Sequence, residues 1–322
     1  MVSKYLVQLV NQVAIQENEI RQIKAISDEL FIILKIHLTF FHGFRVYGSI
    51  TRGTSLSPSI SRKTDVDVFC QYDFGSWKTL IEYNKGIDSN VLTTDIIYKG
   101  LVNLNNEDFK DIKLDYPSVH LSFKGIIFEL TPARGEKGRD MLTLSLPYRE
   151  WEYNHRHLLP LPKQTHVRST SGNKDDDFKN GKPVSKIETI LPYVYNDRVK
   201  TKENNSYFYL IVLLKYWKYV FQSNITSFLL ESDVFDGLEK SNFFNGKKDL
   251  GDLLFTFLTT PEVYNFKLFK MDNQFSELYN NIVIIKKHYD NGEEEDAFYK
   301  LIKCFPPLDY LKKYTFPCSE FD

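Results

Sequence analysis

Cysteine is scarce in this sequence, which contains only Cys70, Cys304 and Cys318. Three residues cannot build a dense disulfide framework, and none of them forms the CxxC pair typical of structural zinc sites. The sequence therefore predicts a protein of the reducing cytoplasm and excludes the class of small, disulfide-rich secreted domains.

An excess of charge of one sign is also missing, since 41 Lys and Arg against 42 Asp and Glu give a formal net charge of −1. No overall basic field favours nucleic acid or an anionic membrane surface. The longest strongly apolar run, Tyr207 to Leu214, has eight residues, whereas a membrane-spanning helix needs about 20. Polar residues interrupt the N-terminal region, which excludes a signal-peptide core. We expect no association with membranes.

Apolar residues, in contrast, are plentiful. They make up 42% of the 322 residues and include 25 Phe and 20 Tyr. Such a chain can bury a sizeable core, which excludes general disorder. Its length fits one large unit or two closely packed units.

The N-terminal half mixes helical and strand patterns. Apolar residues recur at helical spacing from about Glu17 to His42, and the stretches that follow alternate as strands do. We predict strands at Phe44–Tyr47 and around Val66–Phe69, and a hairpin over Val119–Leu130 that turns at Lys124–Gly125 and is closed by Pro132.

The C-terminal half is helical after a polar segment rich in Pro, Gly and Ser, which reads as a long loop or linker. These patterns predict an α+β fold with residues 1–160 as an N-terminal helix plus catalytic domain, 161–186 as the linker and 187–322 as a helical domain. The expected C-terminal helices cover about 207–219, 227–235, 250–258, 274–289 and 294–304.

Two aspartates are the first candidates for catalytic residues. Asp65 and Asp67 are two residues apart in a predicted strand, so both point to one face. Carboxylates that lie so close repel each other unless a cation lies between them, and oxygen ligands suit Mg²⁺ or Mn²⁺. Upstream, Gly48–Ser49 ends a strand before a predicted helix, where backbone N–H groups and the Ser hydroxyl can hold a phosphate. The structural alternatives are two solvated carboxylates on an edge strand and an ordinary turn.

A third carboxylate is expected, because two-metal phosphoryl transfer places one ion on the attacking hydroxyl and one on the triphosphate. Glu129, in the apolar strand IIFELTP, is the best-placed acid. Asp111 and Asp115, in a more loop-like stretch, are the second choices. A solvent-exposed glutamate at a strand end is the structural alternative for Glu129.

These residues resemble a family. GS…TDVDVF with a later FELTPA resembles the polymerase-beta type of nucleotidyltransferase, and more narrowly the cGAS/DncV-like nucleotidyltransferases (CD-NTases), whose signature is GSxxxxT, then DhD and a distant third acid. The stretch LLKYWKYV…SFLLES is similar to the family's LLKxW and SxxLE. The resemblance implies a mixed-sheet core packed on a helical domain, bilobed with a central active-site cleft.

Site roles follow from the resemblance residue by residue. It implies that two Mg²⁺ or Mn²⁺ ions are held by Asp65, Asp67 and Glu129, which are also the catalytic residues. The phosphate-binding residues that it implies are Gly48, Ser49, Arg52, Thr54, Lys215 and Ser227.

Two of these positions have alternatives in the sequence itself. Lys215 interrupts an apolar helix face, where a buried cation needs an anionic partner, although a lysine at the rim of a core can extend its ammonium group into water. Ser227 precedes an apolar run and is also a candidate helix N-cap. The third acid is Glu where Asp is commoner in the family, and the stretch after ELTPA lacks the family's pattern, so base selectivity cannot be transferred.

The resemblance implies a bacterial enzyme that joins ATP or other nucleoside triphosphates into a cyclic or short linear oligonucleotide and releases pyrophosphate. Its product would act on a separate effector protein in antiphage defence. A template-independent RNA or tRNA nucleotidyltransferase is the alternative, with RNA as a partner; it shares the GS…DhD core and would use the Arg/Lys-bearing segment 163–202 as an RNA track. An inactive nucleotide-binding module is the third possibility.

Overall fold

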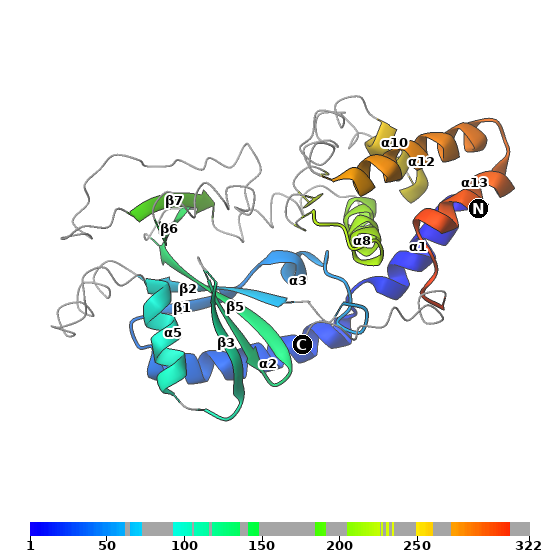
Figure 1. The fold of residues 1–322 in the computed structure, drawn as a ribbon. Helices are drawn as coiled ribbons and strands as arrows, with labels where there is room; N and C mark the ends of the chain where they lie inside the picture. The colour runs from blue at the N-terminus through cyan, green and yellow to red at the C-terminus, as the bar shows by residue number, and fades with distance from the viewer. Residues whose placement is uncertain are drawn as a thin grey trace. The chain divides into compact units, whose positions relative to one another are not determined.

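The computed structural model describes residues 1–61, 65–72, 93–104, 106–115, 118–135, 141–147, 184–190, 205–225, 227, 230–231, 234, 249–259 and 272–309. The chain divides into two compact units (Figure 1). The sheet unit comprises Gln16–Arg52 and Lys63–Thr201. The helical unit comprises Met1–Ile15, Gly53–Arg62 and Lys202–Asp322.

Seven described strands form one sheet in the sheet unit, and five of them follow the order β1-β2-β5-β4-β3. The sheet is mixed, because β2 and β5 pair in parallel whereas β1–β2, β5–β4 and β4–β3 pair antiparallel. β6 pairs antiparallel with the end of β5 and with β7. The strands are β1 Gly43–Val46, β2 Asp65–Tyr72, β3 Phe109–Asp115, β4 Ser118–Phe123, β5 Ile126–Gly135, β6 Met141–Pro147 and β7 Val184–Ile190.

The predicted hairpin is confirmed as β4 and β5. Lys124 and Gly125 form its turn with φ of 48° and 79°, the left-handed backbone that a two-residue hairpin turn requires. The strand continues beyond Pro132, however, where the sequence predicted its end. Pro132 lies past Leu130, the last residue of β5 that pairs with β4. Because proline has no N–H to donate, it is tolerated where one edge of a strand has no hydrogen-bonded neighbour.

Two helices of the sheet unit pack near these strands. The predicted amphipathic helix is α2 (Glu17–His37), which buries Ile23, Leu30 and Leu34 and ends five residues before the predicted boundary. Phe31 of α2 stacks on Phe44 of β1 with ring centroids 5.4 Å apart. The second helix, α5 (Thr93–Asn103), contacts β3, β4 and β5. The sequence patterns did not predict α5, β6 or β7, and Asp111 and Asp115, which they predicted to lie in a loop, are on β3.

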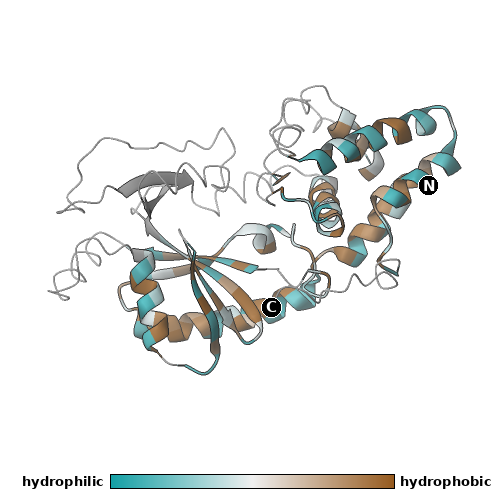
Figure 2. Cartoon of the chain, in the orientation of Figure 1, coloured by the Kyte–Doolittle hydropathy of each residue, from teal (hydrophilic) through white to brown (hydrophobic). Residues whose placement is uncertain are grey.

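The helical unit is formed by α1 (Val2–Val13), α8 (Asn205–Val220), α10 (Leu250–Thr259), α12 (Asn273–Asp290) and α13 (Glu294–Cys304). Figure 2 shows both hydrophobic and hydrophilic residues on α8, and its residues Leu210 to Trp217 are all buried. α1 contacts α8, α10 and α13 through an apolar face that includes Leu6, Leu9 and Val10. Four of the five predicted C-terminal helices are confirmed as α8, α10, α12 and α13, whereas the predicted helix 227–235 lies mostly outside the described residues.

This division differs from the predicted boundaries, which placed all of residues 1–160 together. The first 15 residues and Gly53–Arg62 belong with the C-terminal helices. The reason is the apolar face of α1, together with backbone hydrogen bonds from Ile15 to Ser55 and from Ser57 to Val13. The predicted linker 161–186 lies outside the described residues, except for the first three residues of β7.

The predicted α+β class is confirmed, with a mixed sheet and helices followed by a helical C-terminal part. Among the residues that the structure describes, no helix combines the length and the apolar content needed to cross a bilayer.

Candidate active site

Three carboxylates meet on one face of the parallel pair β2–β5. Asp65 and Asp67 lie two residues apart on β2, and Glu129 of β5 is the register partner of Asp67. One carboxylate oxygen from each of the three lies within 4.8 Å of the other two. The sequence therefore placed both aspartates and the glutamate on strands that the structure brings together; we call them the acid triad.

Strand alternation explains why these acids face together. Val66, Val68, Phe128 and Leu130 occupy the intervening positions and are 0% exposed. Because successive side chains of a strand point to opposite faces, burial of these four sends the acids to the other face. The triad is half-buried there, so water screens its three charges only in part.

Burial raises the pKa of Glu129 above its usual value, the hydrogen bond from Ser118 opposes this shift, and the negative charge of Asp65 adds to it. An ionised Glu129 beside the two aspartates therefore costs free energy. A cation between the oxygens would remove that cost. An all-carboxylate donor set fits Mg²⁺ or Mn²⁺, which prefer oxygen ligands.

Gly48 lies directly against the triad. It begins the short helix α3 (Gly48–Arg52) with a φ of +78°. A Cβ built at Gly48 would collide with Oδ2 of Asp67 and lie 2.8 Å from its Cγ. The backbone N–H of the preceding residue, Tyr47, donates to the carbonyl oxygen of Asp67 at 2.9 Å. The chain thus requires glycine here both for the backbone conformation and for the close approach to Asp67.

Three other predicted site residues belong to the helical unit. Lys215 of α8 forms a buried ion pair with Glu231, and the two side chains are 6% and 3% exposed. The hydroxyl of Thr54 donates to the same carboxylate at 3.0 Å. Ser227 is exposed and accepts a hydrogen bond from Lys218 at 3.3 Å. Ser49 and Arg52 lie on α3, in the sheet unit with Gly48.

Sequence reasoning missed two partners in these networks. Glu231 supplies the anion that a buried Lys215 needs, and it is the glutamate of the SFLLES stretch itself. Ser118 donates to Oε1 of Glu129 at 2.7 Å. The position of Ser118 could have been predicted from the Lys124–Gly125 turn. A two-residue turn fixes the hairpin register, and this register places Ser118 beside Thr131 and near Glu129.

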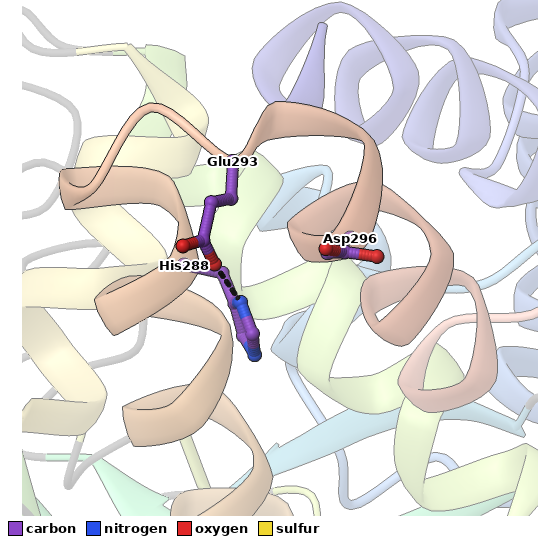
Figure 3. A group of neighbouring side chains, drawn as sticks. All are labelled: His288, Glu293 and Asp296. Atoms are coloured by element: carbon purple, nitrogen blue, oxygen red, sulfur yellow. Dashed lines mark hydrogen bonds and ion pairs between the residues drawn. The ribbon is translucent and has the colours of Figure 1, made fainter.

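A second acidic group lies at the junction of α12 and α13 (Figure 3). Nδ1 of His288 lies 2.5 Å from Oε2 of Glu293, and Asp296 is close to both. Glu293 and Asp296 are exposed. The helix dipole favours acids such as Glu293 and Asp296 at the N-terminus of α13, and a surface contact between His288 and Glu293 needs no further explanation, so we assign this group no function.

The Lys215–Glu231 pair gives a prediction for stability. Lys215→Met leaves the buried Glu231 carboxylate without this ammonium group, so we expect the free energy of unfolding to fall by about 3–5 kcal/mol. Lys215→Met/Glu231→Gln removes both charges and should recover most of that loss. Urea unfolding measures both, with Lys218→Met on the same helix as control. A double variant no more stable than Lys215→Met would contradict the prediction.

No family model matches the sequence, and no curated protein matches it. Among solved structures, the fold is similar to that of CdnC of E. coli MS115-1 with ATP, at 18% identity over 80% of this chain and 70% of that chain, with a TM-score of 0.47. The Cid1 poly(U) polymerase, with Mg and 3′-dATP bound, is 13% identical over 83% and 74%, with a TM-score of 0.47. The CD-NTase CdnG of Bradyrhizobium diazoefficiens in complex with GTP is 10% identical over 79% and 74%, with a TM-score of 0.44. The structures similar to this chain therefore include CD-NTases and an RNA-uridylating enzyme of the nucleotidyltransferase type.

Proposed function

We propose that this protein is a metal-dependent nucleotidyltransferase that joins ribonucleoside triphosphates into a cyclic or short linear oligonucleotide. The observation that carries the proposal is the acid triad, three carboxylates within 4.8 Å of one another on adjacent parallel strands. Gly48, held against Asp67 at the start of α3, supports it, because a strand–Gly-Ser–helix turn brings backbone N–H groups next to the acids.

The acids have defined roles in this reaction. Asp65, Asp67 and Glu129 would hold two Mg²⁺ or Mn²⁺ ions, which when bound supply charge stabilisation for the triphosphate and lower the pKa of the attacking hydroxyl. The 2′- or 3′-hydroxyl oxygen forms a bond to the α-phosphorus as the bond to the leaving pyrophosphate breaks. One carboxylate of the triad accepts the hydroxyl proton. Because the carboxylates are fixed by the sheet, little reorganisation is needed during the step.

The family resemblance assigns phosphate contacts to six residues. Gly48, Ser49 and Arg52 are on α3, and Thr54, Lys215 and Ser227 belong to the helical unit. A lysine ammonium group donates strongly to anionic oxygens, and Lys215 bonds the carboxylate of Glu231. In this reading, Glu231 fixes the direction of the Lys215 side chain and Thr54 fixes the Glu231 carboxylate.

The alternative substrate is the end of an RNA, as in template-independent RNA or tRNA nucleotidyltransferases. The triad serves both reactions equally. The net charge of −1 favours small nucleotides over RNA, because an RNA enzyme needs basic groups that neutralise several phosphates. The Arg/Lys-bearing segment 163–202 is the place where such groups would lie; it falls outside the described residues apart from β7.

One incubation separates these readings. The purified protein is incubated with four radiolabelled nucleoside triphosphates and Mg²⁺ or Mn²⁺, with and without bulk tRNA, beside Asp65→Ala/Asp67→Ala. We expect a small phosphatase-resistant product that forms without RNA and is lost in the variant. Label that appears only in tRNA would replace this reading by the RNA-modifying one. Nucleotide binding without metal-dependent product would indicate an inactive binding module.

The cellular role in the proposal follows from the product. A cyclic or short oligonucleotide acts through a separate effector protein that binds it. In line with the family resemblance, we propose that the pair acts in bacterial antiphage defence in the cytoplasm. Adding the purified product to candidate effectors from the same genome, and measuring their activation, tests this step.

A further inference from the structure

We infer that Ser118 and Thr131 are positioning residues that fix the orientation of Glu129 through a chain of buried hydroxyl groups. The inference rests on the proposed function, since the purpose of the fixed orientation is to present Glu129 to a metal ion. Both residues are almost completely buried, with exposures of 0% and 2%. All residues of this hydroxyl chain belong to the sheet unit.

The hydrogen bonds of this hydroxyl chain connect Thr131 to Glu129 without a gap. Ser118 Oγ lies 2.7 Å from Oε1 of Glu129 and 2.7 Å from Oγ1 of Thr131. Both bonds lie within the pair β4–β5, because Ser118 begins β4 whereas Glu129 and Thr131 are on β5. The chain therefore runs from Thr131 through Ser118 to the third acid of the triad.

Proton counting gives the chain a direction. An ionised carboxylate can only accept, so Ser118 donates its single hydroxyl proton to Glu129. Ser118 must then accept the hydrogen bond from Thr131. Each hydroxyl donates toward the carboxylate, and hydrogen bonds aligned in this way polarise one another.

This arrangement constrains the carboxylate of Glu129. Oε1 accepts the hydrogen bond of Ser118, and one carboxylate oxygen of Glu129 lies within 4.8 Å of oxygens of Asp65 and Asp67. Groups that orient metal ligands in this way affect metal affinity or activity by about 10-fold to 100-fold when they are removed. The loss of the Ser118 hydroxyl should therefore be seen first in the metal dependence and not only in stability.

The test is a titration of the full-length protein with Mn²⁺, with free Mn²⁺ read by electron paramagnetic resonance. The signal lost in Asp65→Ala/Asp67→Ala defines the triad site. Ser118→Ala should weaken that site by about 10-fold or more. Thr131→Val, which removes the hydroxyl at nearly constant volume, should weaken it less, because Ser118 can still donate. Thr131→Ser retains the hydroxyl and should bind Mn²⁺ like the wild type.

Ser122→Ala is the matched control, the same substitution four residues along β4. It should leave the affinity for Mn²⁺ unchanged, and urea midpoints confirm that each variant is folded. Unchanged affinity in Ser118→Ala, or Thr131→Ser as weak as Thr131→Val, would overturn the inference and leave the proposed function standing. A wild-type protein without a Mn²⁺ site that depends on Asp65 and Asp67 would overturn both.

Discussion

Replacing Asp65 and Asp67 together by alanine should lower the rate of nucleotidyl transfer by about a thousand-fold or more. Metal ions that stabilise the charge of the transition state contribute several kcal/mol, and about 4 kcal/mol corresponds to a thousand-fold in rate. The loss should persist at raised Mg²⁺ or Mn²⁺ concentrations, because two of the three carboxylates that lie within 4.8 Å of one another are gone. Single-turnover formation of the radiolabelled product measures it.

The same double variant should not be less stable than the wild type in the absence of metal. Removal of two of three neighbouring negative charges relieves their repulsion, and Val66 and Val68 on the other face still hold β2 in the sheet. Asp111→Asn is the matched control; Asp111 is an exposed acid on β3 with a φ of 52°, a conformation that asparagine also adopts. Equal losses of activity in Asp111→Asn and in the double variant would contradict the assignment of the triad.

Gly48→Ala should reduce nucleotidyl transfer by about a hundred-fold, since a displacement of about 1 Å at a reacting centre costs that much. The new Cβ would occupy the place of Asp67 Oδ2, so the carboxylate must move. The positive φ at Gly48 adds a backbone cost of about 1–2 kcal/mol for a residue with a side chain.

Gly53→Ala separates these two costs. Gly53 has a φ of +70°, but a Cβ there meets nothing within 4 Å. Its substitution should therefore carry the backbone cost in urea unfolding and leave the metal dependence of the reaction unchanged. Comparison of the two variants in unfolding and in transfer assays gives the effect of the collision with Asp67 alone. If both variants lose activity equally, the contact between Gly48 and Asp67 is not what the reaction requires.

The strands of the triad were accessible from sequence because each is defined locally. Alternation of Asp65 and Asp67 with buried valines predicts one acidic face, and the apolar run around Glu129 predicts the second strand. The parallel pairing that sets Asp67 beside Glu129 is different in kind, because it joins strands that are far apart along the chain. Here the motif order of the resembling family, and not any local pattern, suggested that the acids meet.

Other features could not be predicted for the same reason. An apolar helix that contains Lys215 predicts that the ammonium group needs an anion, but many acids are available and only packing selects Glu231. The Lys124–Gly125 turn sets the register that pairs Ser118 with Thr131, but the two residue types do not show that they are buried, since small hydroxyl residues are also common on exposed strands. The domain boundary at residue 160 was placed by a change in composition, whereas the grouping of α1 depends on which helices its apolar face meets.

The position of α1 has a consequence for synthesis on the ribosome, where N-terminal segments emerge first. The helices that cover Leu6, Leu9 and Val10 are α8, α10 and α13, and α8 begins only at Asn205. All described strands of the sheet unit precede that residue, so the sheet can form while the apolar face of α1 is still exposed to water. α1 is thus made before the strands of the sheet unit but packed after them, and the helical unit is complete only once α13 has also been made.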